Sequence, residues 1–259
     1  MRTIPQGLGC GLPWQNHEVD AASLDAALTT LDPDWWHNWK FDQMPRVGYF
    51  PTLWRCSYAT AEYSATFNAA VAAAQTDPGR LWFLGNEPER SDQSNTTPLA
   101  FGRAARRFRR LLPDTPLALP GVMLTMRKDD PGFEWLTVYH RLVLQGKALK
   151  PDYLHYHNYA YVWEQWRDIH NRVRDWCRDA GWPDLLIVTE TAYAGQSEVS
   201  AASVAGNLEI MQRVKAALKV SDVRAAAWMS SRWHDWPGPA SDLLTAGGTL
   251  TQVGTAFVT

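Results

Sequence analysis

Short apolar runs alternate with longer amphipathic stretches along the whole chain. The apolar runs have the length of buried strands, and near-continuous apolar strands covered by helices are typical of a parallel sheet. The pattern predicts eight strands, at Gly7–Leu12, Asp34–Asn38, Val47–Leu53, Leu81–Asn86, Pro116–Val122, Asp152–His157, Leu185–Thr189 and Val223–Trp228.

Helices are expected between these strands, because the intervening stretches carry helical periodicity and end at glycine or proline signals. They fall at Ser23–Thr30, Thr60–Gln75, Pro98–Leu112, Phe133–Gln145, Trp163–Ala180 and Ser203–Leu218, with a short final element at Leu250–Phe257 and a long loop at Ser230–Gly248. Eight strands with interleaved helices in 259 residues have the size of a (β/α)8 barrel. We therefore expect the α/β class and a single-domain (β/α)8 TIM barrel over residues 1–259. A doubly wound sheet is the alternative, but the chain has no glycine-rich dinucleotide fingerprint or phosphate loop.

The composition of the chain argues against nucleic-acid and membrane partners. The net charge is -2, and no basic bias is present that would attract a nucleic-acid backbone. No apolar run approaches the roughly 20 residues of a membrane span. We expect no nucleic-acid or membrane partner, and a monomer. The first residues lack the regions of a secretory signal, which is consistent with a cytoplasmic protein or with a trimmed secreted one.

The cysteines give no evidence of a disulfide or metal site, whereas the tryptophans favour a particular ligand. Three scattered cysteines, Cys10, Cys56 and Cys177, form neither a disulfide framework nor a metal-site spacing. We expect no metal and no cofactor. The 14 tryptophans are more than a core of this size needs. Flat aromatic faces beside strand ends suit the apolar faces of sugar rings, which favours a carbohydrate ligand.

Two carboxylates follow apolar runs of strand length. Glu87 stands at the end of Leu81–Asn86, and Pro88 lacks the N–H that a central strand needs. Glu190 closes the run Leu185–Thr189 in the same way. In a barrel of parallel strands, catalytic residues lie at these carboxyl ends. Paired carboxylates are what glycoside hydrolysis requires, about 5 Å apart in retaining enzymes and farther apart in inverting ones.

These residues carry a resemblance to a known family. Asn86-Glu87-Pro88 together with Glu190 resembles glycoside hydrolase clan A, and more closely the glycosyl hydrolase catalytic core group that includes the family 128 endo-β-1,3-glucanases. The resemblance spans about residues 7–258. The matching pieces are Trp36–Trp39, Tyr49–Trp54, Phe83–Pro88, Pro151–Tyr159, Leu186–Thr191 and Trp228.

The resemblance implies a retaining double displacement, with Glu87 as acid/base, Glu190 as nucleophile and Asn86 bonded to the sugar 2-hydroxyl. It further implies endo action on a β-glucan, most often β-1,3-linked. The chain departs from the family at two positions. Asn158 stands where an aromatic residue is common, and Glu89, expected to be a loop residue, stands where an aspartate is common.

Further substrate contacts are expected around the pair. Strand alternation places His155, His157 and Tyr159 on one side, so that Tyr159 donates to the nucleophile and His157 contacts the acid/base or a sugar hydroxyl. Asn38 is expected to reach sugar hydroxyls. The side chains expected to stack on sugar rings are Trp39, Trp54, Tyr193, Trp228 and Trp236.

Three other functions stay open at this stage. His155, His157 and Glu190 could form the metal site of a hydrolase. A non-catalytic carbohydrate-binding barrel would keep the aromatic cleft without turnover. A glycosidase or transglycosidase acting on a different polysaccharide would share every residue named above.

Overall fold

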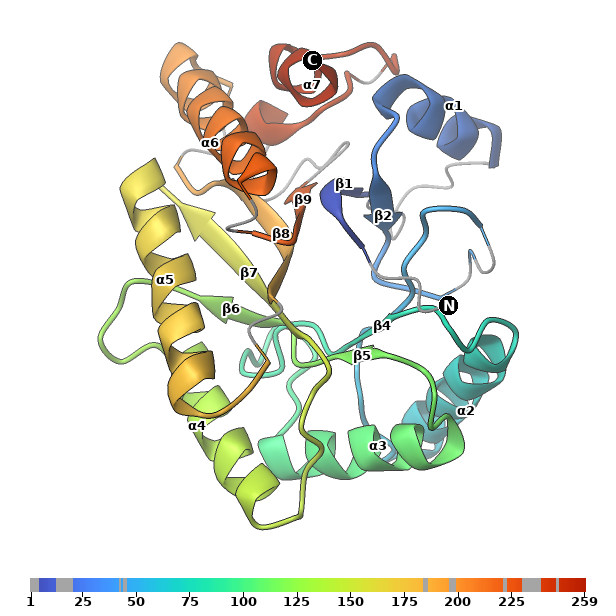
Figure 1. Cartoon of the computed structure of the whole chain (residues 1–259). Helices are drawn as coiled ribbons and strands as arrows, with labels where there is room; N and C mark the ends of the chain where they lie inside the picture. The colour runs from blue at the N-terminus through green and yellow to red at the C-terminus, as the bar shows by residue number, and fades with distance from the viewer. Residues whose placement is uncertain are drawn as a thin grey trace.

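The computed structural model of the chain describes residues 5–12, 21–41, 43, 46–183, 186–195, 199–220, 223–229, 239–245 and 247–259. This part is a mixed α/β fold in which seven α-helices surround parallel strands (Figure 1). The strands are β1 Gly7–Gly11, β2 Trp35–His37, β3 Thr52–Leu53, β4 Trp82–Leu84, β5 Leu117–Ala118, β6 Val122–Leu124, β7 Leu154–Ala160, β8 Leu186–Tyr193 and β9 Ala225–Met229. The helices are α1 Ala21–Leu31, α2 Ala61–Gln75, α3 Pro98–Leu111, α4 Pro131–Leu144, α5 Trp163–Asp179, α6 Ala201–Lys219 and α7 Gln252–Val258, with a 3-10 turn at Pro239–Ser241.

The strands form two parallel sheets. One sheet has six strands in the order β2-β1-β9-β8-β7-β6, and the other has three in the order β3-β4-β5. Two isolated parallel bridges join the edges of these sheets, Trp36 with Tyr49 and Ala118 with Tyr153. The strand expected over Val47–Leu53 is therefore present only as the bridge at Tyr49 and the short β3, because Val47 and Gly48 form a turn.

Three expected strands have different limits in the structure. The run Pro116–Val122 is divided into β5 and β6, because Pro120 has no N–H and the Gly121 carbonyl accepts a bond from Glu87 instead. Both β7 and β8 run past the ends expected for them. Thr191 and Ala192 still pair with Asn158 and Tyr159 of β7. The expectation that Glu190 closes its strand is therefore wrong, since this residue lies within β8.

Helix α4 begins with residues that favour helix initiation. Pro131 occupies the first turn of α4, and the Asp130 carboxylate accepts bonds from the backbone N–H groups of Gly132 and Phe133. Its other oxygen accepts from the Thr125 N–H and hydroxyl, both at 2.5 Å. An aspartate cap combined with an early proline favours helix initiation. These bonds attach the loop after β6 to the start of α4.

The apolar core has two layers, and strand alternation separates them. The inner cluster holds Phe83, Ile187, Ala225 and Ala227 with other strand residues, while their chain neighbours Trp82, Leu84, Val188 and Ala226 belong to the outer cluster. The outer cluster also contains the buried residues of the helices. Each fully buried large side chain contributes about 1.5–3 kcal/mol relative to exposure. The two layers therefore fix which face of each strand points inward.

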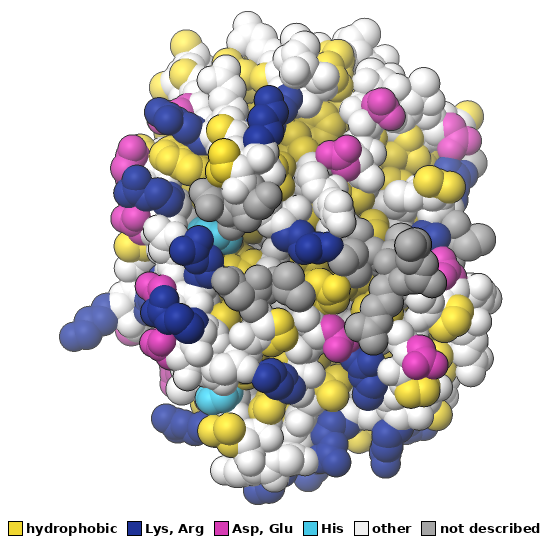
Figure 2. All heavy atoms as spheres, viewed as in Figure 1, with side chains coloured by type: hydrophobic (Ala, Val, Ile, Leu, Met, Phe, Trp, Pro, Cys, Tyr) yellow, Lys and Arg dark blue, Asp and Glu magenta, His cyan; other side chains and the backbone are white. Residues whose placement is uncertain are grey.

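The surface has a mixed character. Acidic and basic side chains are interspersed over most of the face in Figure 2, and Lys and Arg gather at the lower edge, where α3 and α4 lie in Figure 1. No helix in the described part of the chain is long and apolar enough to cross a membrane.

A substitution at Gly85, which joins β4 to the Asn86–Pro88 segment, would test how tightly this junction is packed. Its φ is +85°, and an added Cβ would lie 2.5 Å from Cε2 of Phe101. Phe101 is fully buried against Trp135 and Tyr139, so it cannot yield. We expect Gly85→Ala to lower the free energy of unfolding by about 2–4 kcal/mol, from backbone strain plus overpacking.

Gly146 supplies the matched control, because its φ is +67° but nothing lies within 4 Å of an added Cβ. Gly146→Ala should cost only the strain, about 1 kcal/mol. Urea unfolding followed by circular dichroism measures both variants. Equal losses for the two substitutions would contradict the tight packing at Gly85.

Candidate active site

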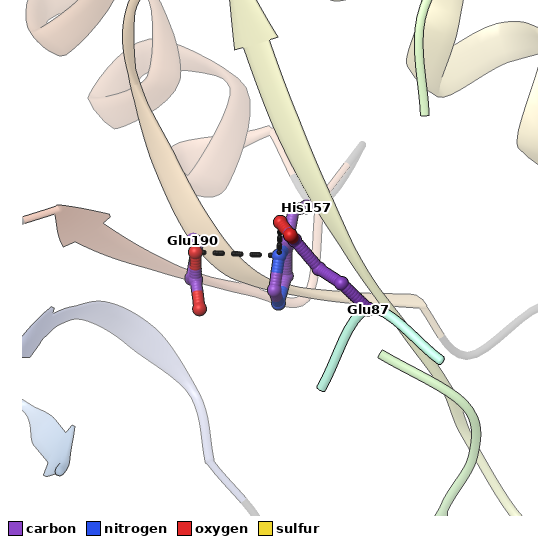
Figure 3. A group of neighbouring side chains, drawn as sticks. All are labelled: Glu87, His157 and Glu190. Carbon is purple, nitrogen blue, oxygen red and sulfur yellow. Dashed lines mark hydrogen bonds and ion pairs between the residues drawn. The ribbon is translucent and has the colours of Figure 1, made fainter. Parts of the chain in front are cut away.

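Three ionisable side chains meet at the centre of the strands. His157 Nδ1 lies 2.8 Å from Glu87 Oε1 and 3.2 Å from Glu190 Oε2, so the ring stands between the two carboxylates (Figure 3). One oxygen of each glutamate and a nitrogen of the histidine lie within 4.8 Å of one another. All three residues are buried. The structure thus brings together two carboxylates that are 103 positions apart in sequence.

Glu87 reaches this point through an irregular backbone after β4. Its φ is +43°, which is unusual for a residue other than glycine. Its N–H donates to the Gly121 carbonyl at 2.6 Å, and this bond uses the acceptor freed by the break between β5 and β6. Strain of this kind persists only where surrounding contacts impose it. On the far side, Arg90 Nε lies 3.2 Å from Glu87 Oε2.

Glu190 reaches the same point through a bulge in β8. Tyr156 pairs with Val188, but the next residue, His157, pairs with Glu190, so β8 contains one extra residue. The pairing with β9 shifts over the same stretch. Strict alternation would place Glu190 on the outer face with Val188. The extra residue reverses its direction, as bulges beside active sites commonly do. Both Thr189 and Glu190 therefore point inward.

Two hydrogen-bond donors hold the Glu190 carboxylate, and His157 lies beside it. Trp39 Nε1 donates to Oε1 at 2.5 Å, and the Tyr159 hydroxyl donates to Oε2 at 2.8 Å, close to His157 Nδ1. Burial raises the pKa of Glu190 above its ordinary value, and the charge of Glu87 adds to this rise. The charge of His157 and the bonds from Trp39 and Tyr159 oppose it. These donors therefore favour the ionised form that burial disfavours.

The three interior histidines have different states. Burial would lower the pKa of His157, but the negative charges of Glu190 and Glu87 outweigh it and raise the pKa. Burial lowers the pKa of both His37 and His155 to about 3, so these two rings are neutral at physiological pH. His37 Nε2 bonds the Thr189 carbonyl at 2.9 Å.

A metal site built on His155 is not supported. Its Nδ1 lies 3.1 Å from Thr189 Oγ1 and its Nε2 lies 3.3 Å from the Leu84 carbonyl, so both nitrogens are engaged. Among the described residues, the one set of side chains close enough to share an ion is Glu87, His157 and Glu190. Within this set a hydrogen-bonded imidazole already joins the carboxylates.

The structure gives Trp39 a role other than the expected one and gives Tyr159 the expected one. Trp39, expected to stack on a sugar, has a φ of +58° and uses its indole N–H to bind Glu190, with 6% of its surface exposed. It acts first as a donor to the carboxylate. Tyr159 has the role expected for it, because its hydroxyl donates to Glu190.

The structure also places the other polar candidates. Asn86 is buried beside Glu87, and its Nδ2 donates to Gln93 Oε1 at 3.3 Å. Asn38 is buried, and its Oδ1 accepts from the Tyr49 hydroxyl at 2.7 Å. Trp54 is half-buried after β3, with the Arg55 guanidinium 5.5 Å from its ring centre.

The remaining aromatic candidates do not gather at the carboxylates. Trp228, expected to stack on a sugar, is fully buried in the outer layer and donates to the Ser241 carbonyl at 2.9 Å. Alternation in β9 turns it away from the inner face, so its ring cannot receive a sugar. Tyr193 lies against Gly195 and Gly206, toward α6. Trp236 lies outside the described residues.

A cavity of about 620 Å³ opens beside the pair, and sequence reasoning missed most of its lining. It is bounded by residues that include Glu89, Arg90, Met126, Tyr159, Tyr161 and Gln165. Glu89 accepts a bond from the Met123 N–H at 2.8 Å, and burial raises its pKa to about 7. The one sequence feature that could have marked Glu89 is its departure from the aspartate common at this position in the family. Nothing in the sequence marked Tyr161.

The raised pKa of Glu89 has a consequence for stability. A carboxyl whose pKa rises from 4.5 to about 7 on folding stabilises the fold below pH 4.5, and that contribution is lost as pH rises through 7. The full difference is on the order of 3 kcal/mol. Glu89→Gln cannot titrate, so the stability of the wild type relative to this variant should fall between pH 4.5 and 8. Urea unfolding across this range measures it, and a constant difference between the two proteins would refute the shift.

Comparisons with known proteins identify the family of the chain. The profile of the glycosyl hydrolase catalytic core family matches residues 11–257. No curated protein matches the chain. Among solved structures, similarity extends to a GH128 subgroup II endo-β-1,3-glucanase from Pseudomonas viridiflava, with 23% identity, a TM-score of 0.67, and coverage of 100% of this chain and 98% of that chain.

Two further structures share the fold. One is a GH128 subgroup III curdlan-specific exo-β-1,3-glucanase from Blastomyces gilchristii in complex with glucose, with 19% identity, a TM-score of 0.70 and coverage of 99% of this chain and 100% of that chain. The other is a GH128 subgroup I endo-β-1,3-glucanase from Amycolatopsis mediterranei in complex with laminaritriose, with 21% identity, a TM-score of 0.67 and coverage of 97% and 98%. Because the family profile covers nearly the whole chain, the protein belongs to the glycosyl hydrolase catalytic core family and is a glycoside hydrolase.

Proposed function

We propose that the protein is a retaining β-1,3-glucanase built as one closed (β/α)8 barrel over residues 1–259. The observation that carries the reaction type is the distance between the carboxylates, with an oxygen of Glu87 and one of Glu190 within 4.8 Å. Retaining glycosidases hold their carboxyl groups about 5–5.5 Å apart, whereas inverting enzymes leave a wider gap for water. The two bridges between the sheets support barrel closure, because they join β2 to the β3 region and β5 to the start of β7.

The surroundings of the two glutamates support different roles. Glu190 receives bonds from Trp39 and Tyr159 and lies beside His157, which favours the ionised nucleophile. Glu87 follows β4 and faces it across the His157 ring. In the first step Glu87 gives its proton to the glycosidic oxygen, and Glu190 attacks the anomeric carbon to form a glycosyl ester. In the second step Glu87 takes a proton from water, which then cleaves the ester.

His157 couples these two steps electrostatically. While Glu190 is ionised, its charge attracts the imidazole. When Glu190 becomes an ester it loses that charge, and Glu87, now ionised, remains the anionic partner of His157 at 2.8 Å. A cation that serves both carboxylates in turn avoids leaving a buried charge without a partner.

The substrate assignment rests on the structural relatives. One of them is described as a complex with laminaritriose, and another as a complex with laminarihexaose captured in a glutamate-to-glutamine mutant. Both endo and exo β-1,3-glucanases occur among the relatives, and we propose endo action for this protein. The paired carboxylates supply both the proton and the nucleophile, and no cofactor takes part in the proposed steps.

Paired variants test the reaction. We expect the wild type to cleave β-1,3-linked oligosaccharides and to release a product whose first-formed anomer keeps the β configuration, read by proton NMR. Glu190→Gln should lower kcat by at least about 10³-fold, and Glu87→Gln by about 10²–10⁴-fold, because each removes a reacting group.

Glu62→Gln is the matched control, since Glu62 is exposed in the first turn of α2 and should leave kcat unchanged. Wild-type rates in Glu190→Gln or Glu87→Gln would refute the roles. An α-configured first product would refute retention. Cleavage of another glycan alone would keep the mechanism but change the substrate assignment. Sugar binding without turnover would favour a carbohydrate-binding protein.

The hydrogen bond from Trp39 to Glu190 should influence the acid limb of the pH profile of kcat/KM. Its bond lowers the pKa of Glu190, whose ionised form attacks the sugar. Trp39→Phe keeps an aromatic ring but removes the N–H, so the pKa of Glu190 should rise and the acid limb of kcat/KM should move to higher pH. Trp54→Phe, which alters an indole outside the Glu190 contacts, is the comparison. An unmoved acid limb in Trp39→Phe would show that the bond does not tune the nucleophile.

A further inference from the structure

The cavity beside the carboxylates lies on one side of them. Its lining comes from β6 and β7, from the segments after β4, β6, β7 and β8, and from α4 and α5. None of its lining residues belongs to β1, β2, β3 or β9. Two of its lining residues contact the glutamates, since Arg90 pairs with Glu87 and Tyr159 bonds Glu190. A sugar chain lying across the catalytic pair would therefore have one end in this cavity.

The lining suits a sugar ring. The side chains of Tyr161 and Met126 are 60% and 49% exposed, and they offer an aromatic face and a flexible apolar chain. Gln165 stands beside them and accepts a bond from the Tyr161 N–H at 3.1 Å. Binding sites of this kind are typically about 300–1,000 Å³ and combine apolar walls with a few polar groups. The cavity, at about 620 Å³, falls within that range.

Glu89 adds an acceptor that lacks a partner. Its Oε1 accepts from the Met123 N–H, whereas its buried Oε2 has no hydrogen-bond partner among the described residues. A buried oxygen left unsatisfied is costly, and such an oxygen in a native site calls for an explanation. A hydroxyl donated by a ligand in the cavity would satisfy it after a small side-chain adjustment.

The neighbours of the proposed acid indicate which end of the substrate enters. Glu89 and Arg90 follow Glu87 after the single residue Pro88, and both line the cavity. In the proposed reaction the acid touches the oxygen of the departing sugar. The sugar that leaves should thus lie on the side of the acid, where this cavity opens.

We propose that the cavity is the leaving-group subsite, in which Tyr161 stacks on the departing sugar and Glu89 accepts a hydrogen bond from one of its hydroxyls. The assignment rests on the proposed function. It makes Tyr161 and Glu89 determinants of which oligosaccharides are cleaved, through contacts that exist only when the leaving group is a sugar.

Comparing the rates on two substrates distinguishes the contribution of this subsite from that of the rest of the active site. A laminari-oligosaccharide releases a sugar, whereas β-laminaribiosyl fluoride releases only fluoride when Glu190 attacks its anomeric carbon and the C–F bond breaks. Tyr161→Ala should lower kcat/KM on the oligosaccharide by about 10-fold and leave kcat/KM on the fluoride within about 2-fold of wild type. Glu89→Gln should show the same split, because it replaces the free acceptor with a donor.

Val162→Ala is the matched control. Val162 is exposed next to Tyr161 but does not line the cavity, and its substitution should change neither rate. Equal losses on both substrates in Tyr161→Ala would place the cavity under the sugar that is retained, and unchanged rates would show that it holds no sugar. Either result overturns the subsite. A wild type that cleaves neither substrate would instead refute the proposed function itself.

Discussion

The extra residue in β8 is the constraint on which the catalytic arrangement depends. Strand alternation assigns Ile187 to the inner face and Val188 to the outer face, and it would send Glu190 outward as well. The bulge shifts the pairing with both neighbouring strands and turns Glu190 inward. A position on the outer face would bury a carboxylate among apolar helix residues, where its desolvation would have no compensation. One inserted residue therefore decides whether the two glutamates can meet.

Bringing two carboxylates together in a buried site carries an electrostatic cost, and the surrounding side chains offset it. His157 lies between the glutamates with a raised pKa, while Trp39 and Tyr159 bond Glu190 from other directions. One of these donors, Trp39, has a positive φ, and so does Glu87. Strained backbone at both positions is consistent with a site whose geometry is imposed by its surroundings. The neutral rings of His37 and His155 are buried as well, and both bond Thr189.

Particular residues show how far sequence reasoning reached. Glu87, Glu190, His157 and Tyr159 were all expected near one point, and the structure brings them together. The alternation of His155, His157 and Tyr159 on one side of β7 was predictable because strand periodicity is local. Trp228 was placed wrongly, since a tryptophan at a strand end does not reveal which face it occupies. Tyr161 and the cavity it borders went unnoticed, because their importance arises from segments far apart in the chain.

The sequence alone determined the alternation of strands and helices, the two carboxylates after apolar runs, and the family to which their motifs belong. These features depend on local periodicity and on residue types, which a linear chain displays directly. Only the tertiary structure decided that Glu190 points inward, that Trp39 serves as a donor, and that Glu89 borders a cavity. Each of these outcomes depends on pairing register, on a backbone turn, or on neighbours distant in sequence. Such relations exist only after the strands have paired, and so no local pattern could specify them.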